Sequence, residues 1–250
     1  MPVQPDIRAI KDEARRLMKS ASVSPLRFTL WFLAAQLMLN LISSAADSFL
    51  PGGTLGSGVY SLSFATVFVM LLSSVLSAGH VCYCLGVQRG ETMPYGSLFD
   101  ALPFAGKVVL LQLLQGGMIA LGLSCFVLPG VVLALAYSQA IYHLCEYPEG
   151  GVLAAMRRSR MEMRGRKGRM LLLFLSFWPL FLAAGAALAC GFPLMDVFPE
   201  TAAGNFLYTL ACGLLSGSVN AFLLPLLKLS QAGFYRAIRS EAPGAAGTLY

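Results

Sequence analysis

Apolar positions in this sequence gather into six long runs, and polar positions fill the short segments between them. A run of about 20 apolar residues is long enough to cross the hydrocarbon core of a bilayer as a helix. We therefore predict an all-α polytopic membrane protein whose six transmembrane helices form three hairpins. The predicted spans cover residues 26–46, 59–87, 108–128, 131–147, 170–189 and 206–229. Pro129 and Gly130, between the third and fourth spans, are expected to turn the chain.

The polar segments that precede the hairpins have helical patterns of their own. In residues 1–25, apolar side chains from Ile7 to Met18 recur at helical spacing among basic residues, which predicts an amphipathic helix on the membrane surface. Residues 94–103 and 152–165 precede the second and third hairpins and also have helical or turn character. The three hairpins are therefore candidates for an internal repeat, although short basic helices at a membrane surface resemble one another in any case.

The positions of the 18 Lys and Arg residues predict the orientation of the spans. With six spans, all 18 lie on one side, and the connections on the other side carry only Asp47, Asp196 and Glu200. Because Lys and Arg are retained on the cytoplasmic side, both ends of the chain are expected to be cytoplasmic. The segments around Gly53, Pro129 and Pro199 are then outside, and residues 230–250 form a cytoplasmic tail.

A cleaved signal peptide is the alternative interpretation of the first apolar run. Ser44-Ala45-Ala46, which follows that run, resembles a cleavage site. The charged leader before the run is long for a signal peptide, however, and the run itself is long enough to span a bilayer. We therefore interpret residues 26–46 as a transmembrane helix.

Composition excludes several classes of function. Apolar residues make up 57% of the chain and charged residues 12%, so no soluble domain fits beside the spans. The net charge of +6 comes from basic blocks that flank apolar runs, which indicates a membrane surface and not nucleic acid. We find no nucleophile triad, phosphate-binding loop or paired carboxylates, so we expect no enzyme activity and no cofactor. The six cysteines are Cys82, Cys84, Cys125, Cys145, Cys190 and Cys212; none has partners at metal-ligand spacing, so we expect free thiols and no metal.

The densest cluster of basic residues predicts a lipid-binding helix. Residues 152–169 combine seven Lys and Arg residues with an apolar stripe that contains Leu153, Met156 and Met163. Such a cluster beside a span attracts anionic lipid by about 1 kcal/mol per residue. We name Arg157, Arg158, Arg160 and Arg164 as candidate ligands of lipid headgroups. The alternative is that the cluster serves only as a signal for membrane orientation.

Uncharged polar residues within the spans are the other candidates for function. The central thirds of the spans contain no charged residue, which disfavours a proton relay, and His143 and Glu146 form an interfacial pair three residues apart. Gln112, Gln139 and Asn220 either join helices by hydrogen bonds or line a path for a solute. A path requires them to face a common space, whereas a scaffold requires them to bond pairwise between helices.

The sequence also resembles a known family. The motifs are Arg89-Gly90-Glu91, Leu98-Phe99-Asp100, Pro129-Gly130-Val131-Val132, Ala136-Tyr137-Ser138, Tyr142, Pro148, Ala154 to Ser159 and Met163-Arg164-Gly165. In this order they resemble domain of unknown function family 975, a group of bacterial six-helix membrane proteins distantly similar to the membrane domain of glycerophosphodiester phosphodiesterases. Two pairs depart from the family pattern, Glu146-Tyr147 and Gln139-Ala140.

The resemblance and the sequence pattern together lead to one expectation of function. The resemblance implies a bacterial plasma membrane and a lipid-facing accessory role. We expect a non-enzymatic accessory or scaffold protein whose partners are membrane lipids, with anionic lipids favoured. The alternative is a small-solute transporter or channel that uses the polar residues within the spans.

Overall fold

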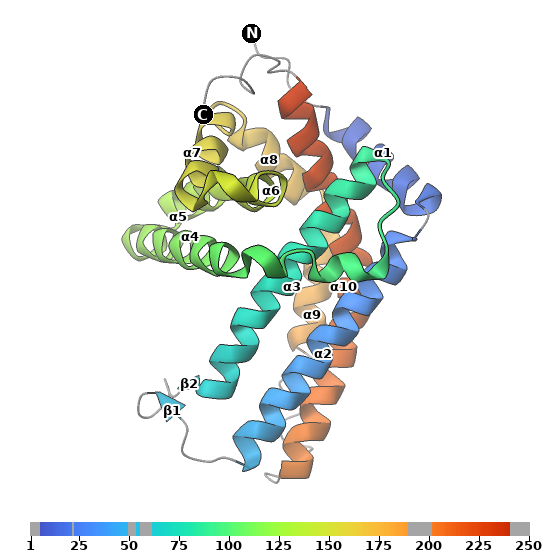
Figure 1. Cartoon of the computed structure of the whole chain (residues 1–250), viewed down its shortest axis with the longest axis vertical. Coiled ribbons are helices and arrows are strands. Elements are labelled where there is room, and N and C mark those ends of the chain that lie inside the picture. The colour runs from blue at the N-terminus through green and yellow to red at the C-terminus, as the bar shows by residue number, and fades with distance from the viewer. Residues whose placement is uncertain (1–5, 22, 50–53, 56–61, 190–201, 241–250) are drawn as a thin grey trace.

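The computed structural model describes residues 6–21, 23–49, 54–55, 62–189 and 202–240 (Figure 1). Its α-helices are α1 (Ile7–Ser20), α2 (Pro25–Phe49), α3 (Phe64–Arg89), α4 (Ala105–Cys125), α5 (Val127–Tyr137), α6 (Ala140–Glu146), α7 (Val152–Glu162), α8 (Lys167–Leu175), α9 (Trp178–Ala189) and α10 (Ala202–Ser240). The described residues also form the short 3-10 helices η2 (Tyr95–Phe99), η3 (Leu102–Phe104) and η4 (Pro148–Gly150). Strands β1 (Thr54–Leu55) and β2 (Leu62–Ser63) form a two-residue antiparallel pair.

The predicted all-helical fold is confirmed within the described residues. Within the described residues, five helical segments are long and apolar enough to cross a membrane, and a sixth is added if α8 and α9 form one span bent by 54°. Each of the six predicted apolar runs overlaps one of these segments. The number of helices that cross a bilayer is a separate question, because it depends on how the helices are oriented relative to one another.

Four helices run side by side and form what we call the shaft: α2, α3, α9 and α10 (Figure 1). Small residues bring α2 and α10 close together, since a Cβ atom added to Gly213 would lie 2.3 Å from the Leu37 side chain. Further along the same interface, Thr209 Oγ1 donates to Ser44 Oγ at 3.3 Å. Close packing of small residues and hydroxyl bonds are typical contacts between helices in a bilayer.

Helices α4 and α5 form a hairpin, the arm, that runs across the direction of the shaft (Figure 1). Its side chains are largely apolar and exposed; Leu113, Leu121, Phe126 and Leu128 are 65–78% exposed. The turn lies at Phe126, and not at Pro129-Gly130 as predicted. Pro129 occupies the first turn of α5, where the backbone N–H has no helical partner to lose, and Gly130 packs closely against Leu123.

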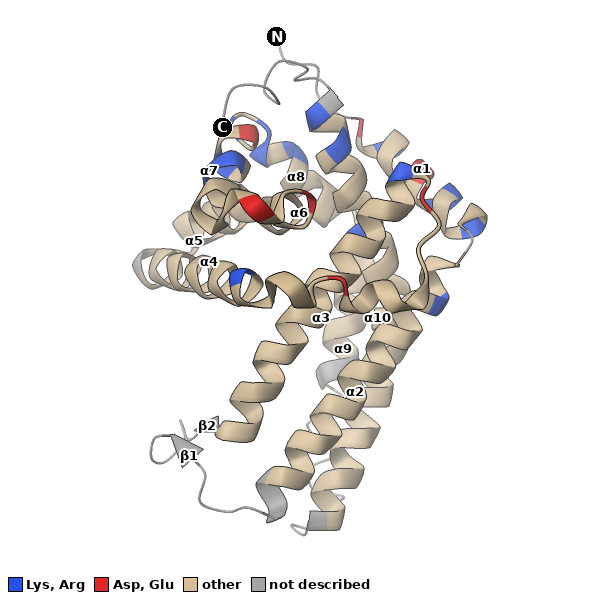
Figure 2. Cartoon of the chain, viewed as in Figure 1, with Lys and Arg blue, Asp and Glu red and all other residues tan. Residues whose placement is uncertain are grey.

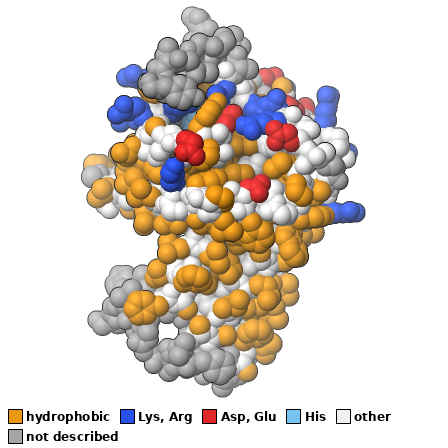
Figure 3. Space-filling view, viewed as in Figure 1, with side chains coloured by type: hydrophobic (Ala, Val, Ile, Leu, Met, Phe, Trp, Pro, Cys, Tyr) orange, Lys and Arg blue, Asp and Glu red, His pale blue; other side chains and the backbone are white. Residues whose placement is uncertain are grey.

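Charged residues gather at one end of the molecule (Figure 2). This charged end comprises α1, the end of α3, helices α6 to α8 and the C-terminal part of α10. The rest of the shaft carries apolar side chains on the face shown in Figure 3. Such a division is typical of a helical bundle whose apolar part lies in lipid and whose charged end lies in water. The connections around Gly53 and Pro199, with Asp196 and Glu200, lie outside the described residues.

Two segments at the charged end pack on the protein, although the sequence suggested a tail and a surface helix. The predicted polar tail is helical through Ser240, because Phe234, Tyr235 and Ile238 are buried and hold α10 against its neighbours. In α1 the apolar stripe packs on protein: Ile10 and Ala14 are buried, and Ile10 lies against Gly233 of α10. For α1 the hydrophobic stripe identified the helix but not the surface that covers it, and for the end of α10 the stripe was not recognised.

Candidate functional site

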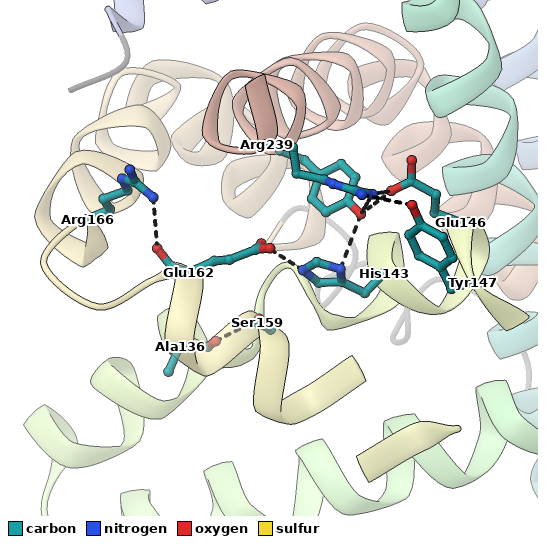
Figure 4. Close-up of polar contacts among 9 residues, drawn as sticks. Ala136, His143, Glu146, Tyr147, Ser159, Glu162, Arg166 and Arg239 are labelled. Carbon is teal, nitrogen blue, oxygen red and sulfur yellow. Dashed lines mark hydrogen bonds and ion pairs between the residues drawn. The ribbon is translucent and has the colours of Figure 1, made fainter. Parts of the chain in front are cut away.

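A network of polar side chains joins four helices at the charged end (Figure 4). His143 and Glu146 lie three residues apart on α6, and Tyr235 and Arg239 lie four apart on α10, so each pair shares one helix face. The two faces meet. The hydroxyl of Tyr235 and Nη1 of Arg239 both donate to Oε2 of Glu146, and Oη of Tyr235 lies 3.2 Å from Nδ1 of His143.

The network extends from this centre to α3 and α7. Nε2 of His143 lies 2.7 Å from Oε2 of Glu162 on α7, and Nη2 of Arg89 on α3 donates to Oε1 of Glu146 at 2.8 Å. Arg239 Nη2 also donates to the hydroxyl of Tyr147 at 2.8 Å. We call these seven residues the polar network: Arg89, His143, Glu146, Tyr147, Glu162, Tyr235 and Arg239.

His143 lies at the centre of the polar network. Its Nδ1 faces the hydroxyl of Tyr235 and its Nε2 faces the carboxylate of Glu162, so the ring lies between a phenol oxygen and a carboxylate. The side chain of His143 is 2% exposed, so it ties α6 to α7 and α10 within the protein interior.

Polar side chains also bind the backbone where α5 gives way to α6. The helix breaks at Ser138-Gln139, which frees carbonyl groups that need donors. Ser159 Oγ of α7 donates to the carbonyl of Ala136 at 2.8 Å (Figure 4), and Gln115 Nε2 of α4 donates to that of Tyr137 at 2.7 Å. The break is therefore stabilised from both sides by neighbouring helices, as is required of irregular backbone that does not face water.

The three polar residues proposed from the sequence lie in three different places. Nε2 of Gln112 on α4 is 3.4 Å from the carbonyl of Ser74 on α3. Gln139 is fully buried at the break between α5 and α6, and its Nε2 lies 3.8 Å from Sδ of Met170 on α8. Asn220 lines a groove of about 470 Å³ between α2 and α10, which neither of the two glutamines lines. They do not face one common space.

The four arginines proposed as lipid ligands lie on α7 and in the turn that follows it. Arg157, Arg160 and Arg164 are exposed, and Arg158 is half-buried with its guanidinium 5.6 Å from the ring centre of Tyr147. The predicted single surface helix is divided into α7 and α8, because Gly165 adopts a positive φ of 79° between them. The apolar face of α7 packs on protein: Met156 and Met163 are 5% and 0% exposed, whereas Leu153 is 72% exposed.

Sequence reasoning identified only part of the polar network. It singled out His143 and Glu146 by their spacing, but it placed Tyr235 and Arg239 in a tail and gave Glu162 no role. A usable signal was present: Gln231, Phe234, Tyr235 and Ile238 continue the helical spacing of buried positions in α10. Among the described residues, no three His, Cys, Asp or Glu side chains group as metal ligands, and the described cysteine side chains are free thiols.

Comparison of the chain with models of protein families, with curated proteins and with solved structures finds no match. The functional interpretation therefore rests on the chain's own residues and their contacts.

Proposed function

We propose that the protein is a multi-pass component of a bacterial plasma membrane, and that it acts as a non-enzymatic scaffold or accessory protein that binds membrane lipids. One observation carries the proposal: the glutamines inside the bundle, and the polar network at its charged end, bond between helices instead of converging on one cavity. A scaffold requires pairwise bonds of this kind. The motifs that resemble domain of unknown function family 975 suggest the same role, but no family model matches the chain, so the proposal rests on these contacts.

A small-solute transporter is the second candidate, and the groove between α2 and α10 is the observation that favours it. Gln36, Asn40 and Asn220 place amides along this groove. Gln36 is already bonded across to α3, since Ser73 Oγ donates to its Oε1 at 2.8 Å. Gln112 of α4 and Gln139 at the α5–α6 break do not line this groove. The groove alone is therefore weaker support than the pairwise bonding is for a scaffold.

The proposed orientation places the charged end in the cytoplasm. The shaft then crosses the bilayer, and α8 leads from the charged end into α9 through the 54° bend. Because the arm runs across the shaft, we place α4 and α5 along the cytoplasmic surface of the bilayer, with their exposed apolar side chains in lipid. Four crossings keep both chain ends and all the basic residues on one side, just as six crossings do. The two arrangements differ in whether α4 and α5 of the arm lie along the bilayer surface or cross it.

Lipid binding by α7 follows from its exposed arginines. Changing Arg157, Arg160 and Arg164 together to Gln should weaken retention of phosphatidylglycerol roughly a hundredfold, because each basic residue near the surface contributes about 1 kcal/mol. Arg158 is left in place because it stacks on Tyr147. The measurement is mass spectrometry of the lipid that remains with protein purified from mixed phosphatidylcholine and phosphatidylglycerol vesicles.

The matched control changes Arg8, Arg16 and Lys19, three exposed basic residues of α1, to Gln. It removes the same charge from the same end of the molecule. If both triple variants retain equal amounts of phosphatidylglycerol, the α7 cluster serves only as an orientation signal.

A further inference from the structure

A cavity of about 160 Å³ lies where α1 and α10 meet the bend between α8 and α9. It is separate from the polar network, and none of the residues proposed from the sequence lines it. Two basic residues of α1 line it, Lys11 and Arg15, together with Ser230 of α10. Phe177, Leu180 and Leu226 form its apolar wall. The cavity therefore combines positive charge with a hydrophobic surface.

Lys11 is held at the cavity with part of its donor capacity unused. Its Nζ lies 3.4 Å from the carbonyl oxygen of Ser176 and 4.8 Å from the ring centre of Phe177. An ammonium group has three donors, so these contacts leave donors for a ligand. Arg15 pairs with Asp12 at 3.5 Å, but both side chains are more than 60% exposed, and such surface pairs are weak. The guanidinium can therefore turn toward an anion.

Ser230 adds an independent sign that a ligand belongs here. Its side chain is fully buried and lines the cavity, yet its hydroxyl has no hydrogen-bond partner within the described part of the chain. Buried polar groups in native proteins are almost always paired, because burial without a partner is costly. A group that enters the cavity and accepts a hydrogen bond would remove this cost.

We propose that this cavity binds the phosphate group of a membrane phospholipid. A phosphate carries negative charge and several acceptor oxygens, which match the ammonium of Lys11, the guanidinium of Arg15 and the hydroxyl of Ser230. The inference rests on the proposed membrane placement, in which the bend lies at the boundary between the charged end and the shaft. It goes beyond the α7 cluster because it assigns a defined pocket beside α1, a different helix of the charged end.

The apolar wall makes a lipid the source of the phosphate. Phe177, Leu180 and Leu226 line the side of the cavity that adjoins α9. On α9, Trp178, Phe181 and Leu182 are 40–56% exposed. An acyl chain attached to the bound headgroup would cover this surface. Free phosphate has no group that would use it.

The test compares two double variants of α1 in nanodiscs that contain phosphatidylcholine and phosphatidylglycerol. Lys11→Gln with Arg15→Gln should lower the phosphatidylglycerol retained by the purified protein roughly tenfold or more, because two basic residues facing the headgroup are lost. Arg8→Gln with Arg16→Gln removes the same charge from exposed positions that do not line the cavity and should lower retention clearly less. Equal loss in the two double variants would overturn the proposal.

Ser230→Ala separates binding from folding. Because its hydroxyl has no partner in the protein, the alanine variant should be at least as stable to heat as the parent when lipid is removed, yet retain several-fold less phosphatidylglycerol. Unchanged retention by Ser230→Ala would contradict the site. In a third arm, inorganic phosphate and glycerol phosphate are added as competitors; displacement of the lipid by either at equal concentration would show that the cavity recognises free phosphate instead.

The same measurements separate this proposal from the proposed function. If the parent protein retains no anionic lipid at all, the lipid-binding role fails. If the parent protein retains anionic lipid and none of the cavity variants changes the amount retained, the cavity fails as the site and the broader role stands.

Discussion

Replacing Glu146 with alanine is expected to lower the free energy of unfolding by about 3 kcal/mol, because the change leaves Arg89 and Arg239 without their carboxylate. The side chains of Glu146 and Arg239 are 19% and 23% exposed, so water compensates only part of the loss. Tyr235 also loses the acceptor of its hydroxyl proton. Thermal unfolding in detergent, followed by circular dichroism, measures the effect.

The control is Glu149→Ala, which removes the same charge from an exposed position three residues later. It should change stability by less than about 0.5 kcal/mol. A double-mutant cycle between Glu146 and Arg239 should give a coupling energy of at least about 1 kcal/mol, since the two side chains are in direct contact. Equal effects of the two alanine variants would mean that the polar network does not hold the helices together.

Changing Gly79 to alanine is expected to have a comparable effect on stability by a steric route. A Cβ atom at this position of α3 would lie 1.9 Å from the carbonyl oxygen of Leu98 and 2.6 Å from its carbonyl carbon. These are backbone atoms of η2, and the Leu98 side chain is fully buried in the core, so the segment can move only by leaving its packing. We expect a loss of about 3 kcal/mol in the free energy of unfolding.

Gly116→Ala is the matched control for this steric prediction. Gly116 lies in the arm, and an added Cβ atom would meet nothing within 4 Å. Alanine there should leave stability unchanged or raise it by up to about 1 kcal/mol, since alanine favours helix over glycine. If the two glycine variants unfold at the same temperature, η2 does not pack on α3 as closely as the structure shows.

The apolar pattern was sufficient to locate the helices, because the length of an apolar run is a local property of the chain. Each of the six predicted spans overlaps helical segments of the described residues. The pattern could not give their directions. Residues 108–128 resemble any other span in sequence, yet α4 runs across the shaft (Figure 1). The bend between α8 and α9 falls within the predicted span 170–189. Direction depends on which neighbouring helix each face meets.

The candidate site was harder to predict because its members are far apart in sequence. Glu146 meets Arg89 across 57 residues, and His143 meets Tyr235 across 92. A single sequence identifies residues that share a helix face, such as His143 and Glu146, but it does not identify the face opposite. The same limit explains α7, where Met156 and Met163 form an apolar stripe that packs on protein instead of lipid.

The placement of the charged end in the cytoplasm is tested most directly by labelling single cysteines in intact cells with a thiol reagent that does not cross membranes. In a variant whose six native cysteines are replaced by alanine, cysteine is introduced at Gly53, at Leu128 in the arm, or at Arg164 in the charged end. We expect Gly53→Cys to react from outside, and Leu128→Cys and Arg164→Cys to remain unlabelled until the cells are opened or the membrane is dissolved. Labelling of Leu128→Cys from outside would show that the arm crosses the bilayer and that there are six spans. Labelling of Arg164→Cys from outside would contradict the cytoplasmic placement of the charged end.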